Sequence, residues 1–184
     1  MSNEKIKATQ RALKIIGDHP SFDIAEFIDR ISVKQDWAKI VVAHIYLDHI
    51  ITDLLRNKLA YPDDYLDKRG FSDKLVLCQS LGYLRGQFGS VLRKINSSRN
   101  KFAHELLFEV SETEKRDLFR TLTTERPISD VIEEGGFEEF LITVVIFAEA
   151  SRAAERRRED ISKEQDYVIG KILEILIANK SSIG

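Results

Sequence analysis

The residue types best suited to chemistry gather in one short segment, Arg99-Asn100-Lys101-Phe102-Ala103-His104. Histidine moves protons near neutral pH because its ordinary pKa lies there, and the planar fork of an arginine matches phosphate oxygens. Asn100 precedes His104 by about one helical turn, so a helix would place both side chains on the same side. The segment therefore indicates proton transfer and phosphate binding as the chemistry to consider first.

Arg99 lies less favourably on the helix predicted around it, from about Ser90 to Leu107. It falls at the apolar edge beside Ile95, where a charge is costly unless it is paired, and we expect Asp48 to be its structural partner. Arg99 and His104 are about 140° apart around the helix, so they line one groove only if the groove wraps that side or a second subunit covers it. The alternative is purely structural: His104 would be a half-exposed histidine favoured by the helix dipole, and Arg99 an ion-pair partner.

The charge distribution adds a weak signal. The chain has 28 Lys and Arg against 30 Asp and Glu, a net charge of −2, so its overall charge does not indicate nucleic-acid binding. No Asp or Glu occurs between Lys74 and His104, although chance alone can produce such a gap. The basic residues in that interval are Lys74, Arg85, Arg93, Lys94, Arg99 and Lys101.

The segment Arg99–His104 resembles the Arg-polar-x3-His motif of HEPN domains, which are helical and usually dimeric. The preceding Leu92-Arg93-Lys94-Ile95 is similar to the mannitol operon repressor (MltR-like) branch of that superfamily. So are the long apolar stretch Trp37–Leu59 and the Gly70-Phe71-Ser72-Asp73-Lys74 segment. The resemblance covers about residues 37–107 and implies a HEPN-type helical bundle that forms a homodimer.

Many HEPN domains are metal-independent endoribonucleases, so the resemblance implies RNA as a partner and no metal or other cofactor. On that basis His104 would be the general acid or base, and Arg99 would stabilise the phosphorane-like transition state. Asn100 would orient the imidazole or a phosphate oxygen. The expected RNA-binding residues are Arg93, Lys94, Asn96 and Lys101. The products would carry a 2′,3′-cyclic phosphate and a 5′-hydroxyl. The protein would then be a toxin or defence effector, with an antitoxin as a further partner.

The MltR-like branch implies a second function, because its namesake is a regulator. The chain would then be a non-catalytic transcriptional regulator acting through protein partners. No helix-turn-helix pattern for reading DNA is visible in the sequence. The two expectations therefore differ in whether the Arg99–His104 pair cleaves RNA.

Two other groups of residues are weaker candidates. His44 and Asp48 share a helix side and His49 is adjacent, but further metal ligands are lacking, so we expect a satisfied core histidine and no metal site. Arg152 and Arg156–Arg158 form a basic cluster interleaved with acidic residues. A solvated helix face is the ordinary interpretation of such a cluster, and an RNA-steering patch is the alternative.

The elements that position these residues all follow a helical period, and no segment shows sustained alternation, so we predict an all-α fold in one domain, residues 1–184. Ser21 is expected to cap the second helix, and Ser111 with Glu114 to form a capping box. A loop is expected from Arg126 to Gly136. The predicted helices are Lys5–Ile16, one after Ser21, Asp36–Leu59, Lys74–Leu81, Ser90–Leu107, Glu112–Leu122, Phe137 to about Arg158, and Asp166–Ala178, with the last two either separate or continuous.

Composition bounds the setting of the protein. The single cysteine, Cys78, excludes a disulfide within one chain and favours a reducing cytoplasm, and its apolar surroundings predict a buried, inert thiol. The longest uncharged apolar stretch, Phe140–Ala148, is far shorter than the ~20 residues needed to span a bilayer. We therefore expect a cytoplasmic protein with no membrane association.

Overall fold

The computed structural model describes residues 3–17, 19–84, 86–104, 109–122 and 136–181. Within these ranges every regular element is an α-helix, which confirms the predicted all-α bundle. The helices are α1 (Asn3–Ile16), α2 (Ile24–Ile31), α3 (Asp36–Arg56), α4 (Pro62–Leu66), α5 (Phe71–Ser80), α6 (Phe88–His104), α7 (Glu112–Leu122) and α9 (Phe137–Ser181).

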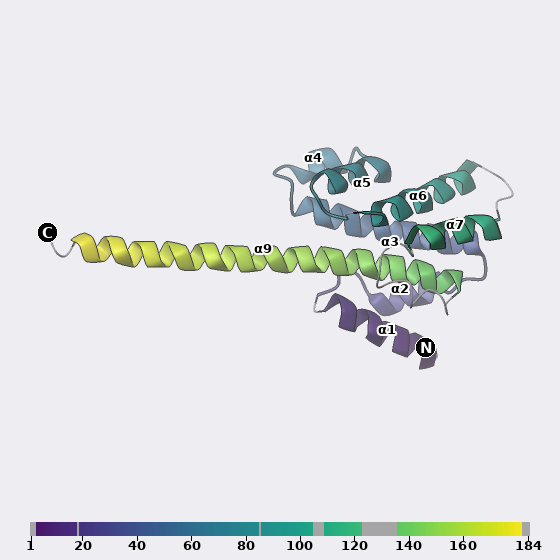
Figure 1. Ribbon diagram of the computed structural model, residues 1–184, viewed down its shortest axis with the longest axis horizontal. Helices are drawn as coiled ribbons and strands as arrows, with labels where there is room; N and C mark the ends of the chain where they lie inside the picture. Colours follow the sequence, from purple (N-terminus) through teal and green to yellow (C-terminus); the bar gives the residue numbers. More distant parts are fainter. Residues whose placement is uncertain (1–2, 18, 85, 105–108, 123–135, 182–184) are drawn as a thin grey trace.

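Helices α3 and the first part of α9 form the centre of the bundle (Figure 1). Helices α1 and α2 lie on one side of this pair, and α4 to α7 lie on the other (Figure 1). The second part of α9 continues as one helix well beyond the bundle (Figure 1). The two C-terminal helices of the sequence prediction are therefore a single helix.

Helix α3 is central because its apolar residues occupy most of its circumference, as the sequence predicted. Every residue of the predicted stripe is buried, and the most exposed, Leu54, is 3% exposed. Ile40 is also a member. The other members are Ala43, Leu47, Ile50 and Ile51. Burying this stripe away from water stabilises the bundle by about 25 cal/mol per Å² of apolar surface.

Local signals placed some helix ends correctly. Helix α7 has the predicted bounds, and its capping box forms: the Ser111 N–H donates to Glu114 Oε2 at 3.0 Å and the Glu114 N–H donates to Ser111 Oγ at 3.2 Å. Helix α5 begins at Phe71, three residues before the predicted start, with Gly70 as its N-cap. The short α4, which has Pro62 at its first position, lies between α3 and α5 and was not among the predicted helices.

The predicted cap of α2 was wrong. Asp23, not Ser21, caps this helix, and its Oδ1 accepts from the N–H groups of Ala25 and Glu26 at 2.8 and 3.1 Å. Asp23 lies directly before the first helical residue, where a side-chain oxygen reaches the unpaired N–H groups. Ser21 instead bonds to Glu149 on α9, a partner remote in sequence.

Two further expectations concern single regions. Cys78 is buried, as predicted, and burial raises the pKa of its thiol to about 12. Among the described residues, no helix is both long and apolar enough to cross a bilayer. Part of two other predictions, the end of the 90–107 helix and most of the 126–136 loop, falls outside the described residues.

Candidate functional site

Helix α6 carries the residues that sequence analysis selected, and packing fixes which side of it faces outward. Val91, Ile95 and Ser98 lie on its buried side, and the partly buried Phe102 stacks on Trp37 of α3 with ring centroids 4.2 Å apart. These residues follow each other at intervals of three or four, which is one side of a helix. The opposite side is therefore the one open to solvent.

Arg99 is exposed, although it follows the buried Leu92 and Ile95 by seven and four residues and so lies in their row, at the predicted apolar edge. This row is buried at Leu92 and Ile95 and open to solvent at Arg99, next to the buried Ser98. The Arg99 guanidinium donates from Nη1 to Asn100 Oδ1 at 3.3 Å and forms no ion pair with a described carboxylate. Asn100 and His104 are also exposed.

The predicted ion pair between Arg99 and Asp48 was also wrong. Asp48 Oδ1 instead accepts from Lys74 Nζ at 3.1 Å, and Thr52 Oγ1 accepts from the same ammonium at 2.9 Å. Lys74 is only 7% exposed, so its charge needs a carboxylate far more than the exposed Arg99 does. The buried lysine of α5 was not foreseen because its packing on α3 depends on tertiary contacts.

The four residues predicted to bind RNA all have partners within the chain. Lys94 donates to Asp117 at 2.6 Å and Lys101 to Glu114 at 2.9 Å, and these two pairs join α6 to α7. Arg93 bonds to Gln79 and Ser90, and Asn96 bonds to His44 and Ser72. On α6, Ser97, Arg99, Asn100 and His104 are thus the exposed polar side chains least tied to other elements. His104 makes no side-chain hydrogen bond to a described residue.

His44 on α3 contacts α6, and no pattern in the sequence indicates this contact. Its Nε2–H donates to Asn96 Oδ1 at 2.9 Å, and its ring lies 4.6 Å from that of Phe71. Burial lowers the pKa of His44; the charges of Arg99 and Lys74 lower it further, while the Asn96 hydrogen bond and Asp48 raise it.

The lowered pKa favours the neutral form of the His44 imidazole. It is a satisfied, half-buried histidine, as predicted. In the described part of the chain, no group of three or more His, Cys, Asp or Glu side chains could hold a metal.

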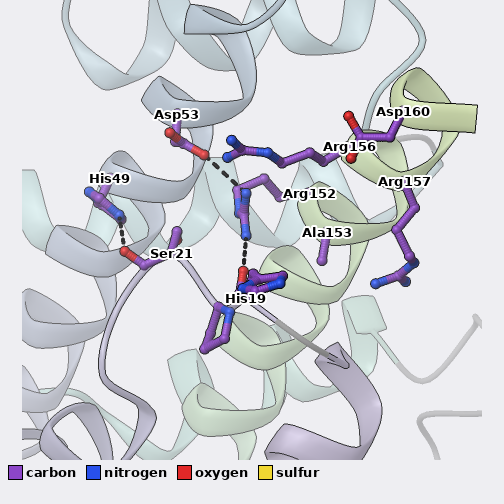
Figure 2. Close-up of a pocket in the computed structure, with 10 residues that line it drawn as sticks. His19, Ser21, His49, Asp53, Arg152, Ala153, Arg156, Arg157 and Asp160 are labelled. Atoms are coloured by element: carbon purple, nitrogen blue, oxygen red, sulfur yellow. Dashed lines mark hydrogen bonds and ion pairs between the residues drawn. The ribbon is translucent and has the colours of Figure 1, made fainter. Parts of the chain in front are cut away.

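A second polar region lies where α9 meets α3 and the loop between α1 and α2 (Figure 2). Here a hollow of about 620 Å³ is bordered by residues from all three. Arg152, the inner end of the predicted solvated cluster, is only 2% exposed, so the expectation of a solvated face was wrong at this position. The lining residues are His19, Pro20, Ser21, His49, Asp53, Arg152, Ala153, Arg156, Arg157 and Asp160.

Arg152 holds this region together. Its Nε and Nη2 donate to the two oxygens of Glu149 at 2.9 and 2.8 Å, a bidentate pair with a fully buried carboxylate. Its Nη1 donates to Asp53 Oδ2 and its Nη2 also to the His19 carbonyl, both at 3.1 Å. Glu149 is satisfied from the other side by the Ser21 N–H at 2.6 Å and hydroxyl at 2.9 Å. A buried charge is tolerated only when it is paired and hydrogen-bonded in this way.

The outer arginines of the same helix are bound more loosely. Arg157 Nη1 donates to the Ile16 carbonyl at 3.1 Å, where α1 ends. Arg156 is exposed and makes no side-chain hydrogen bond or ion pair with a described residue. Because side chains four residues apart share a helix side, Arg156 lies one turn beyond Arg152 on the border of the hollow (Figure 2).

The chain's likeness to known proteins gives no further constraint. No protein-family model, curated protein or solved structure matches it. The geometry therefore presents two places for chemistry: the exposed Arg99–His104 side of α6 and the arginine-lined hollow against α9.

Proposed function

We propose that this protein is a metal-independent endoribonuclease of the HEPN type that acts through the exposed side of α6. The observation that carries the proposal is the exposure of Arg99, Asn100 and His104 on one helix, with no described carboxylate paired to the guanidinium. An unpaired guanidinium offers its planar fork to phosphate oxygens, and an exposed imidazole is accessible to a substrate proton.

The reaction uses a nucleophile supplied by the RNA. The 2′-hydroxyl attacks the adjacent phosphorus and loses its proton to a base, and the 5′-oxygen leaves with a proton from an acid. His104 would act in one of these proton transfers, and Arg99 would stabilise the negative charge that builds on the phosphate oxygens. The products would carry a 2′,3′-cyclic phosphate and a 5′-hydroxyl.

A second copy of the chain would complete the site. Each chain presents one exposed histidine on α6, while the chemistry needs both an acid and a base. His44, the nearest other histidine described above, is tied to Asn96 and half buried. Two α6 surfaces facing each other would bring together two Arg–His pairs in a homodimer.

One observation favours the alternative function, a non-catalytic regulator that binds protein partners. Lys94 and Lys101 beside the Arg99–His104 side are neutralised by carboxylates of α7, which weakens the electrostatic attraction for a long RNA. The hollow against α9 is also lined by residues outside α6. An open surface with paired lysines suits a protein partner as well as a nucleic acid.

The deciding experiment measures RNA cleavage in EDTA by the wild type and by His104→Ala, with analysis of the product ends. We expect the substitution to lower the rate about 10²–10⁴-fold, the usual contribution of a general acid or base. His49→Ala is the matched control, because His49 is another exposed histidine, on α3, with one hydrogen bond to the Ser21 carbonyl.

The outcomes separate the two functions. His104-dependent cleavage that leaves cyclic phosphate ends supports the endoribonuclease. Equal cleavage by wild type and His104→Ala contradicts the assignment of the catalytic residue. A folded dimer that cleaves neither tRNA, rRNA nor mRNA supports the regulator.

A further inference from the structure

The second part of α9 lies outside the bundle that carries α6. Helix α9 runs unbroken from Phe137 to Ser181, and its second part continues well beyond the bundle (Figure 1). Most helices in proteins are stabilised by packing of an apolar side and only weakly by the propensity of their residues. A projecting helix that carries an apolar side therefore calls for a partner along that side.

An apolar row follows this projecting part in the sequence. It begins at Ile161, whose surface is 56% exposed. The next positions follow in steps of four, three, four and three, so all of them share one side of the helix. Steps that alternate in this way are the heptad pattern by which helices pair side by side. The row is apolar at four of its five positions, which are Ile161, Gln165, Val168, Ile172 and Ile175.

The same row leads back into a hollow of about 320 Å³ where α9 leaves the bundle. Ser151, Ala154 and Arg158 of α9 line this hollow, and their positions continue the row from Ile161 in steps of three, four and three. We call it the base hollow; its other lining residues are Leu54, Gly82, Tyr83, Leu84 and Glu155. A helix lying along the row would therefore meet a partly apolar recess at the bundle end.

The charges of the projecting part do not suit a nucleic acid or an anionic membrane. Both partners are bound by an excess of Lys and Arg. Between residues 161 and 181 the two signs are balanced, with Lys163, Lys171 and Lys180 against Glu164, Asp166 and Glu174. A helix with an equally balanced charge and a matching apolar row is that of a second copy of this chain.

The two edges of the row favour an antiparallel pair. Glu164 and Lys171 flank the row on one edge, whereas Ile169 and Leu176 flank it on the other. In an antiparallel pair like edges meet, so the two apolar edges would cover each other. A parallel pair would instead place the charged edge of each copy against the apolar edge of the other.

One register satisfies both the charged edge and the base hollow. When Glu164 of one copy lies opposite Lys171 of the other, the symmetry of the pair forms this ion pair twice. The same register places residues 154–158 of one copy opposite residues 177–181 of the other, at the end of α9. The end of each helix would therefore reach the base hollow of the other copy.

We propose that the projecting part of α9 pairs in antiparallel fashion with the same segment of a second copy, and that the end of each helix occupies the base hollow of the other. The contact would remove Ile161 from water. It does not involve α6, so it joins two copies whether or not two α6 surfaces also meet.

Sedimentation equilibrium of the full chain measures this contact. We expect Ile161→Asp to halve the mass of the wild-type assembly, because the new carboxylate would have to be buried against the second copy. Lys163→Asp is the matched control. It introduces the same carboxylate at an exposed position about 200° away around the same helix, so the mass should stay that of the wild type. Circular dichroism confirms that both variants remain helical.

Charge reversal tests the antiparallel register. Glu164→Lys alone should weaken the association about three- to tenfold at low salt, because like charges would then face each other twice. Combining Glu164→Lys with Lys171→Glu should restore the wild-type association, because each ion pair is re-formed with its charges exchanged.

Three results would overturn the proposal. A wild type that is monomeric at every concentration, or an Ile161→Asp assembly of wild-type mass, would show that the row does not hold a second copy. A double variant that associates no better than Glu164→Lys would contradict the antiparallel register. Cleavage of RNA by wild type and His104→Ala is a separate measurement, so this proposal and the proposed function succeed or fail independently.

Discussion

Two arginines on different helices have environments opposite to those that their sequence surroundings indicate. Arg99 lies one helical turn from the apolar Ile95 and Ala103, yet its side chain is exposed and bonds only to Asn100 among the described residues. Arg152 begins a run of charged residues in α9, yet it is 2% exposed and makes four hydrogen bonds. Arg99 was expected to need an ion-pair partner, yet no described carboxylate pairs with it. Arg152 was expected to be solvated, yet two carboxylates hold it.

The difference shows what decides burial on a helix. Helix α6 is covered along only part of one side, so Leu92 and Ile95 are buried whereas Arg99 in the same row is exposed. Helix α9 passes between α3 and the α1–α2 pair, so more of its circumference is covered (Figure 1). A charged residue on such a helix is buried unless it lies on the remaining open strip.

The largest expected effect comes from removing each arginine in turn. Arg152→Ala should lower the free energy of unfolding by about 3–5 kcal/mol, because Glu149 is left as a buried, uncompensated charge. Arg99→Ala should change it by less than about 0.5 kcal/mol, as for most exposed residues. Urea denaturation of both variants measures the two values. Equal losses would show that the contrast between the two arginines is not real.

A smaller effect should appear in the pH dependence of stability, through His44 beneath the Arg99 side of α6. Its pKa is lower in the folded protein than its ordinary value of 6.5, chiefly through burial, so the unfolded chain binds the proton more readily. The unfolding free energy should therefore fall as the pH drops through 6.5 toward the folded-state pKa. The slope should be at most about 1.4 kcal/mol per pH unit, and smaller because the ring is partly exposed to solvent. His44→Gln should remove this slope.

The control is the same stability measurement at lower pH, where the carboxyl groups titrate. Asp36 and Glu114 have pKa values lowered by lysine partners, so the stability they contribute is lost only below their ordinary values of 3.8 and 4.5. An unchanged slope in His44→Gln between pH 7 and 5 would mean that His44 titrates alike in both states.

The smallest expected effect is the influence of the Arg99 charge on the pKa of His44. The charge of Arg99 is one cause of the lowered pKa of His44, after burial, so Arg99→Ala should raise that pKa. Arg99→Lys keeps the charge and should leave the pKa near that of the wild type. An NMR titration of the imidazole measures both variants. If Arg99→Ala left the pKa unchanged, the Arg99 charge would lie too far from His44 to matter.

Features set by neighbouring residues could be predicted from the sequence. The apolar stripe of α3 and the capping box of α7 both formed as expected, because a helix fixes the relative direction of residues within a few positions. The burial of Cys78 follows from the same periodicity. The exposure of Arg99 does not follow from periodicity, because Leu92 and Ile95 in the same helical row are buried.

Partners remote in sequence could not be predicted. Ser21 bonds to Glu149 instead of capping α2, and Asp48 pairs with Lys74 instead of Arg99. Each choice depends on which helices pack side by side, and on which buried charge most needs a partner. The arginine-lined hollow joins α3, α9 and the α1–α2 loop, so no local pattern marks it in the sequence.

The sequence by itself determined that this protein is all-α and which residue types α6 carries, since both follow from periodicity and composition within each helix. The tertiary structure alone decided that Arg99 faces solvent, that Arg152 is buried against Glu149, and that a hollow lies beside it. The physical reason is that periodicity fixes angles around one helix axis, whereas burial and pairing depend on the helices packed against it.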